Sequence, residues 1–186
     1  MNAYAILNDA EEISEMATAL SQMFRYSVRN LEVVTLKEEI EHVQNFLIVE
    51  EHRFQKTFHV ILDIDPVLYE EEMVKLSLQP IVENAIHHGL RKKRYEGEIL
   101  IRATAIGERL QVEIIDDGAG ISPDRLTYIL AALNGEEYQE VSNKMGIGVN
   151  NVNRRIQLIF GESYGLTLSS ELGKGTTVQM IVPRRK

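Results

Sequence analysis

The chain has 186 residues, 44% hydrophobic and 26% charged, which is the balance of a folded globular protein of one or two small domains. It contains no cysteine, which excludes disulfides, thiol catalysis and cysteine-ligated metals. A formal net charge of −8 argues against nucleic acid as a partner. Because we find no signal peptide and no apolar run of roughly 20 residues, we expect a cytoplasmic chain that meets a membrane only through segments absent here.

Residues 3–54 predict two helices. In the first, apolar residues recur every three or four positions, at Ala3, Ile6, Ala10, Ile13, Ala17, Leu20 and Phe24. Thr35 and Glu38 form a capping-box signature at the start of the second, whose apolar positions are Leu36, Ile40, Val43, Leu47 and Phe54. We expect an antiparallel hairpin that pairs with a second copy in a homodimeric four-helix bundle. In the alternative, both helices pack on the rest of the same chain.

From residue 55 onward the hydrophobic period changes to that of strands alternating with helices. Five segments predict strands, namely residues 57–64, 98–106, 109–116, 164–171 and 176–182. Three helices are expected between them, at residues 75–88, at 122–134 with Ser122 as N-cap and Pro123 next, and at 149–160. This order predicts an α/β two-layer sandwich with a mixed sheet over residues 55–186, preceded by a helical domain over residues 1–54.

The predicted helix around residues 79–89 has an unusual polar arc. Its apolar residues fall on one side, and the opposite arc carries Glu83, Asn84, His87 and His88. A carboxylate, an amide and two imidazoles suit a ligand with polar and charged parts, although a solvated helix face is the alternative. Zinc does not fit, because adjacent His87 and His88 diverge and no third ligand stands at a matching spacing.

The segment Asp116-Asp117-Gly118-Ala119-Gly120-Ile121 follows a predicted strand. Gly118 and Gly120 permit a tight turn in which a flat ligand can approach the backbone, and Asp116 can accept a hydrogen bond from an exocyclic amine. An ordinary β-turn is the alternative. Calcium does not fit, because the further ligands of a calcium loop are missing.

Two glycine-rich segments complete the set. Gly146, Ile147, Gly148 and Val149 open the last long helix, where free N–H groups and the helix dipole favour an anion. The third glycine of a dinucleotide fingerprint is absent, since Asn151 stands in its place. Gly173-Lys174-Gly175-Thr176 precedes the final strand, so it is not a P-loop, and alone it is typical of a hairpin turn.

The order of these four motifs resembles the superfamily that unites gyrase, heat-shock chaperones, histidine kinases and mismatch-repair ATPases, which share the Bergerat ATP-binding fold. Asn84, Asp116 to Gly120, Gly146 to Gly148 and Gly173 to Thr176 match its N, G1, G2 and G3 boxes. Within it the chain is most similar to the LytS-type sensor histidine kinases, through residues 36–54, 78–89 and 146–155. The resemblance covers nearly the whole chain.

The resemblance implies a role for each matched residue. Asp116 would hold the adenine amine, Asn84 would coordinate Mg²⁺ that bridges the phosphates of ATP, and Glu83 would be the carboxylate that assists transfer. Residues 122–145 would form a lid over ATP. The remaining expected nucleotide-binding residues are His87, His88, Gly118, Gly120, Ile121, Gly146, Ile147, Gly148, Val149, Gly173, Gly175 and Thr176.

The sequence departs from the family pattern in three places. His87 stands where lysine is usual, which makes a permanent positive charge titratable, and Asp117 stands where asparagine is commoner. Both changes would weaken ATP binding if they lie beside the nucleotide. The family's phosphorylated histidine has no counterpart, since His42, His52 and His59 do not occupy the matching place. We therefore expect a C-terminal part of a longer protein.

These inferences predict an ATP-dependent histidine kinase fragment of a two-component system. It would transfer the γ-phosphate of Mg-ATP to a histidine located upstream, for relay to the receiver domain of a response regulator, although the fragment alone would lack the acceptor. Two alternatives share the site. One is a non-enzymatic ATP- or ADP-binding regulatory module, and the other is a serine kinase of the anti-sigma-factor type.

Overall fold

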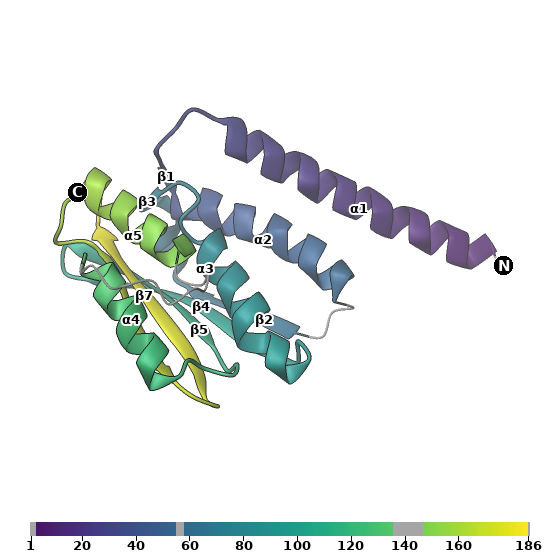
Figure 1. The fold of residues 1–186 in the computed structure, drawn as a ribbon. Helices are drawn as coiled ribbons and strands as arrows, with labels where there is room; N and C mark the ends of the chain where they lie inside the picture. Colours follow the sequence, from purple (N-terminus) through teal and green to yellow (C-terminus); the bar gives the residue numbers. More distant parts are fainter. Residues whose placement is uncertain (1–2, 55–57, 136–146, 186) are drawn as a thin grey trace.

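The computed structural model describes residues 3–54, 58–135 and 147–185, and its centre is a five-stranded mixed sheet (Figure 1). The strand order is β2-β4-β5-β7-β6, with β2 and β4 parallel and the other pairs antiparallel. This confirms the predicted mixed sheet. The strands are β2 (Phe58–Ile64), β4 (Gly97–Ile106), β5 (Arg109–Asp116), β6 (Gly165–Glu171) and β7 (Gly175–Pro183).

Alternation along the strands decides which face of the sheet is buried. On β5, Leu110, Val112 and Ile114 are buried, and the residues between them are only partly covered. The register sets Ile114 opposite Ile101 on β4 and opposite Val178 on β7, so apolar side chains of three strands form one layer of the core.

Three helices cover this buried face, as predicted (Figure 1). They are α3 (Gln79–Asn84), which continues as the π-helical turn η2 (Ala85–Leu90), then α4 (Pro123–Leu133) and α5 (Ile147–Phe160). Pro123 begins α4 as expected, but the side chain of Ser122 makes no capping bond to it. Short 3₁₀ helices lie at η1 (Pro66–Glu70) and η3 (Arg91–Lys93).

One predicted helix boundary is wrong. The helix expected from residue 75 begins only at Gln79, because Glu72–Val74 forms strand β3, which pairs antiparallel with β1 (Val33–Thr35). This two-stranded sheet was not predicted. It brings the connection between the two N-terminal helices against the segment that precedes α3.

The N-terminal hairpin consists of α1 (Ala3–Val28) and α2 (Leu36–Arg53), which lie side by side (Figure 1). The capping box is confirmed, because Thr35 Oγ1 accepts from the Glu38 N–H at 3.2 Å and Glu38 Oε2 accepts from the Thr35 N–H at 3.0 Å. The apolar stripe of α2 is buried in the same core as the sheet, so α2 packs on the domain that follows it.

Helix α1 carries two apolar stripes. The side chains of Met16, Ala19, Met23 and Tyr26 are the less exposed ones and lie toward the rest of the chain. The stripe noted in the sequence is exposed, at 64% for Ile13, 51% for Leu20 and 69% for Phe24. The apolar periodicity therefore predicts correctly that α1 is a helix, but it does not identify the face of α1 that contacts α2. In the described part of the chain, no helix combines the length and hydropathy needed to cross a bilayer.

Candidate functional site

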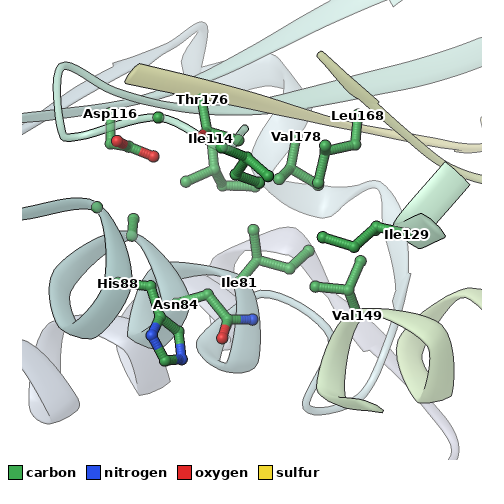
Figure 2. A pocket seen from close by; sticks show the side chains of 14 residues that line it. Ile81, Asn84, His88, Ile114, Asp116, Ile129, Val149, Leu168, Thr176 and Val178 are labelled. Atoms are coloured by element: carbon green, nitrogen blue, oxygen red, sulfur yellow. The ribbon is translucent and has the colours of Figure 1, made fainter. Parts of the chain in front are cut away.

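A pocket lies between the sheet and the helical layer (Figure 2). It encloses about 600 Å³ including its open mouth, and most of its wall is apolar. An apolar cavity with a few convergent polar groups is typical of small-molecule sites. The apolar walls are Ile81, Ala85, Ile114, Ile121, Ile129, Val149, Leu168 and Val178.

Four polar side chains enter this wall from two opposite layers. Asp116 and Thr176 face each other across the β5–β7 register, and Asn84 and His88 come from α3 and η2. Figure 2 shows the Asp116 carboxylate at the sheet side of the cavity, with Asn84 and His88 on the helical side. The site thus offers a carboxylate at one layer and an amide with an imidazole at the other.

Asp116 is 6% exposed and accepts a hydrogen bond from the Gly118 N–H at 2.9 Å. Burial raises the pKa of its carboxyl to about 6, the Gly118 N–H opposes that rise, and the charge of Asp117 adds to it. A nearly buried carboxylate with one oxygen held by a backbone N–H keeps its other oxygen as an acceptor for a ligand amine.

Close backbone approach explains the glycines around Asp116. A Cβ on Gly118 would lie 2.4 Å from the carbonyl carbon of Gly89, and one on Gly175 would lie 1.9 Å from the Asp116 carbonyl oxygen. Gly120 has a φ of +64°, and a Cβ there would lie 2.0 Å from the Glu171 carbonyl oxygen. Gly118 and Gly175 are therefore required by packing around the Asp116 turn, even though neither lines the pocket itself.

The β6–β7 connection holds the same turn from the other side. The Gly173 N–H donates to the Ala119 carbonyl at 2.7 Å, and the Ile121 N–H donates to Ser170 Oγ at 2.9 Å. Ser170 Oγ in turn lies 2.9 Å from Thr176 Oγ1. These bonds therefore join the Asp116–Gly120 turn to the Gly173–Thr176 segment, and Thr176 reaches the pocket wall.

The N-terminus of α5 lies beside Asn84. A Cβ on Gly148 would be 4.0 Å from Asn84 Nδ2, so no side chain fills this space, and Val149 lines the pocket. Free N–H groups at such a helix start favour an anion. Ile147 begins the helix, while Gly146 and the lid positions after Gly135 lie outside the described residues.

Two residues of the predicted polar arc do not reach the pocket. Glu83 is exposed, and His87 turns to α2, where its Nε2 lies 3.2 Å from Glu50 Oε2 and its ring meets Phe54 edge-on. The expected single polar arc is thus split, because the π-helical turn begins at Ala85 and changes the angular step. His88 stays at the wall, where burial first and then the charge of Arg125 lower the pKa of its imidazole.

Asp117 also faces away from the pocket. Its Oδ1 accepts from the Glu98 N–H at 3.0 Å, its Oδ2 lies 3.4 Å from Lys93 Nζ, and that ammonium also bonds to the Asp117 carbonyl. The extra negative charge expected beside a nucleotide is therefore paired at the start of β4.

The sequence prediction included two apolar wall residues, Ile121 and Val149, but missed one glycine and the other wall residues, namely Ile81, Ala85, Ile114, Ile129, Leu168 and Val178. Gly89 lies against the carboxylate, since a Cβ there would be 2.6 Å from Asp116 Oδ1, and its carbonyl accepts from the Ala119 N–H at 2.8 Å. The inward alternation of the strands was the available signal for the wall residues. Among the described residues, no cluster of three or more His, Asp or Glu side chains could hold a metal alone.

Two family models match the chain. Residues 71–186 match the model described as "Histidine kinase-, DNA gyrase B-, and HSP90-like ATPase", a family that binds nucleotide, and residues 1–58 match the model described as "Histidine kinase". Together they cover the N-terminal hairpin and most of the sheet with its helices, while residues 59–70, which include most of β2, lie between the two matched ranges.

Curated relatives agree with these models. The chain is 35% identical over 181 residues to the sensor histidine kinase BtsS of Escherichia coli, covering 97% of this chain and 29% of BtsS. It is 32% identical over 186 residues to the sensor histidine kinase YesM of Bacillus subtilis, covering 100% of this chain and 30% of YesM. It is 29% identical over 177 residues to the sensor protein LytS of Staphylococcus saprophyticus, covering 94% of this chain and 29% of LytS.

Solved structures share the fold. The mycobacterial sensor histidine kinase MprB matches with a TM-score of 0.60 and 16% identity, over 83% of this chain and 97% of that one. The catalytic domain of the histidine kinase ThkA matches with a TM-score of 0.60 and 15% identity, over 82% and 95%. On the family model, the chain belongs to the histidine kinase-, DNA gyrase B- and HSP90-like ATPase family, and the relatives to which it is similar include sensor histidine kinases.

Proposed function

We propose that the pocket binds ATP with its adenine at Asp116 and its phosphates toward Asn84 and the start of α5. The observation that carries the proposal is that the nearly buried carboxylate of Asp116 and the partly buried amide of Asn84 line one apolar-walled pocket from opposite layers. Apolar walls suit a purine ring, the carboxylate suits its amine, and the free N–H groups of a helix start suit a phosphate.

Magnesium fits this site only together with the nucleotide. The amide oxygen of Asn84 is a hard oxygen ligand of the kind that Mg²⁺ accepts, and the described residues supply no cluster that would hold the ion without phosphates. When bound, Mg²⁺ would neutralise phosphate charge during transfer. We assign Asn84 as the protein ligand, with His88 beside the phosphate path.

The chain spans about three tenths of the length of its curated relatives, so the activity of the whole protein is also a proposal. We propose that the parent protein is an ATP-dependent histidine kinase that acts in the cytoplasm. Its acceptor histidine would lie outside this chain and pass the phosphoryl group to the receiver domain of a response regulator. Glu83, exposed one residue before Asn84, is free to meet an incoming acceptor and is our candidate for the assisting carboxylate.

We further propose that residues 1–54 mediate dimerisation and residues 55–186 form the catalytic part. The exposed stripe of Ile13, Leu20, Phe24 and Val28 supports this, because α1 offers it in addition to the stripe turned toward the rest of the chain. Exposed apolar side chains in a heptad-like row favour a second helical partner.

The nucleotide proposal is tested by titration calorimetry with ATP and Mg²⁺ on the wild type, Asp116→Ala and Asp117→Asn. Asp116→Ala should bind ATP about 10- to 150-fold more weakly than wild type, because it loses a buried, charge-assisted hydrogen bond. Asp117→Asn should change the affinity less than about threefold, because that side chain bonds to Glu98 and Lys93. Equal affinity of wild type and Asp116→Ala would refute the assignment.

A further inference from the structure

Glu39 on α2 is fully buried and binds the backbone just ahead of α3. Its carboxylate accepts from three consecutive N–H groups, those of Leu76 at 2.6 Å, Ser77 at 2.8 Å and Leu78 at 2.9 Å, and from Ser77 Oγ at 3.2 Å. Leu76 and Ser77 precede α3, and Leu78 is its N-cap residue, so the Leu78 N–H is one of the donors that a helix leaves unsatisfied at its start. Glu39 therefore anchors the backbone that leads into α3, and caps its N-cap residue, from a different helix.

Nothing within α3 replaces this cap. Leu78 occupies the N-cap position and offers no side-chain acceptor, and Pro80 follows at the second helical position. Leu76 has a φ of +55°, a left-handed conformation that is uncommon for a residue with a branched side chain. The turn over Lys75–Leu78, which we call the junction, is thus held in an unfavourable shape by the carboxylate of Glu39.

The junction controls where Asn84 lies. Asn84 is the last residue of α3, which has only 6 residues, so a shift at the start of this short helix is carried to the pocket. A second bond from α2 fixes the same end, since His42 Nε2 lies 2.6 Å from Gln79 Oε1. Small displacements of positioning groups have large effects on ligand geometry.

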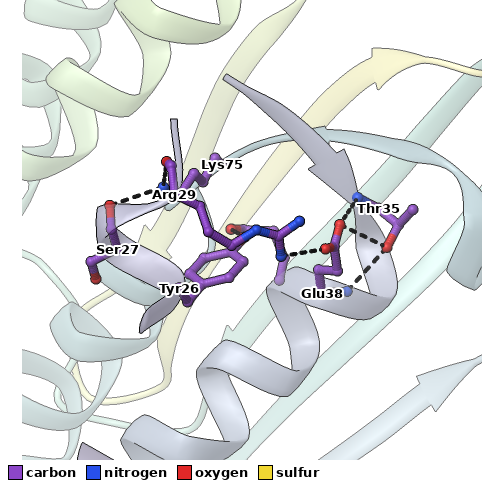
Figure 3. A network of polar contacts seen from close by, with 7 residues as sticks. Tyr26, Ser27, Arg29, Thr35, Glu38 and Lys75 are labelled. Atoms are coloured by element: carbon purple, nitrogen blue, oxygen red, sulfur yellow. Dashed lines mark hydrogen bonds and ion pairs between the residues drawn. The ribbon is translucent and has the colours of Figure 1, made fainter. Parts of the chain in front are cut away.

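The end of α1 is tied to the same junction. Tyr26 donates its hydroxyl to Glu39 Oε1, and Lys75 Nζ donates to the carbonyls of Ser27, at 2.9 Å, and Arg29. Figure 3 shows the two bonds of Lys75 beside the Arg29–Glu38 ion pair, which joins the end of α1 to the start of α2 at 2.7 Å.

Helix α5 reaches the junction as well. Arg155 Nη2 donates to the Lys75 carbonyl at 2.7 Å. The helix whose N-terminus lines the pocket is therefore bonded to the same short turn as α1 and α2. A displacement of the end of α1 would therefore strain its bonds to Glu39 and Lys75, which hold the segment before Asn84 and contact α5.

We propose that Glu39 is a positioning residue for Asn84, and that Tyr26 and Lys75 extend this positioning to the end of α1. The affinity for the phosphate part of the nucleotide then depends on how α1 is held. By reciprocity, a bound nucleotide also changes how firmly α1 is held. This inference rests on the proposed nucleotide function and names the residues that couple it to the hairpin.

The test compares the affinities for ATP with Mg²⁺ and for adenosine, both measured by calorimetry on the 186-residue chain. Glu39→Gln should weaken the affinity for ATP–Mg²⁺ by about 10-fold. Its affinity for adenosine should stay within about twofold of wild type, because the base is held by Asp116 on a different element. The matched control is Glu41→Gln, an exposed glutamate on the same helix, which should change neither affinity.

Each outcome decides the proposal. Equal ATP affinity of Glu39→Gln and wild type, or equal weakening of both ligands, overturns it, since the second result is that of a general structural role. If Glu39→Gln does not fold, Tyr26→Phe decides, because it removes one bond to Glu39 and keeps the ring that stacks on His42 at 4.4 Å. Tyr26→Phe should weaken the affinity for ATP–Mg²⁺ about threefold and leave the affinity for adenosine unchanged. An unchanged affinity for ATP–Mg²⁺ in this variant overturns the proposal. A wild type that binds neither ligand instead refutes the nucleotide function itself, and the inference falls with it.

Discussion

The Nε2 atom of His87 lies 3.2 Å from Oε2 of Glu50, which joins the turn after Asn84 to α2. Glu50 is buried, and the aromatic ring of Phe54 lies edge-on to the imidazole. Where the family resemblance expects a lysine near phosphates, this chain thus has a histidine turned toward a buried carboxylate of the N-terminal hairpin.

Replacing this histidine should affect stability more than binding. We expect His87→Ala to lower the free energy of unfolding by about 1–3 kcal/mol, because the buried carboxylate of Glu50 loses one of its two partners among the described residues, the other being Arg53 at 3.5 Å. Its affinity for ATP should stay within about threefold of wild type, since small effects are typical of residues outside the ligand contact. Urea denaturation and calorimetry measure the two quantities, with His59→Ala on the exposed side of β2 as control. A folded His87→Ala protein that binds ATP tenfold more weakly would contradict the observed orientation.

Asp116 should make the stability of the ligand-free protein depend on pH. Its pKa in the fold is about 6, above the ordinary 3.8, so the folded chain binds this proton more tightly than the unfolded chain does. Its contribution is therefore favourable at low pH and is lost as the pH rises through about 6, which amounts to about 2–3 kcal/mol.

The variant Asp116→Asn removes that titration. It should be more stable than wild type at pH 7.5 by up to about 2–3 kcal/mol, and the difference should vanish near pH 4. Urea unfolding of both proteins between pH 4 and 8 measures this, with Asp63→Asn, an exposed partner of Arg102, as control. Parallel stability curves for wild type and Asp116→Asn would contradict the desolvated state of the carboxylate.

Alanine substitution at two glycines near the site should change the free energy of unfolding in opposite directions. Gly118→Ala should destabilise the fold by about 1–3 kcal/mol and weaken ATP binding, because its Cβ would meet the Gly89 backbone at 2.4 Å. Gly148→Ala should stabilise it by about 0.5 kcal/mol, because its nearest neighbour is 3.9 Å away and α5 gains a helix former. Thermal unfolding measures both, and a tolerated Gly118→Ala would disprove the close approach.

The exposed stripe of α1 should control the oligomeric state. Leu20→Glu combined with Phe24→Glu should convert a dimer into a monomer, because it places charges in an apolar helix interface. Ser21→Glu, exposed on the same helix, is the matched control and should remain dimeric. Light scattering at several concentrations measures the mass. A wild type that stays monomeric throughout would reject dimerisation for this chain.

Much of the fold was predictable because periodicity and local stop signals determine it. The five strands end within a residue or two of their predicted bounds, and Pro123 and the Thr35 capping box begin their helices as expected. Strands β1 and β3 have only 3 residues each, so neither carries a readable alternation. Their pairing is also why the helix at Gln79 starts late.

The site was predictable in its motifs but not in its side-chain directions. Asn84, His88, Asp116 and Thr176 share one pocket, as the order of the motifs suggested. The turn of His87 toward Glu50 depends on a π-helical step that regular helix geometry does not include. Two glutamates of α2 are buried toward the segments flanking Asn84, which no pattern in the sequence indicated: Glu39 accepts from the Leu78 N–H, and Glu50 Oε2 lies 3.2 Å from His87 Nε2.

The most direct test is a crystal structure of the chain with a non-hydrolysable ATP analogue and Mg²⁺. The account predicts the exocyclic amine of adenine within hydrogen-bond distance of Asp116, the metal on the amide oxygen of Asn84, and a phosphate at the start of α5. An adenine ring bound outside the pocket, or phosphates directed away from Asn84, would contradict it.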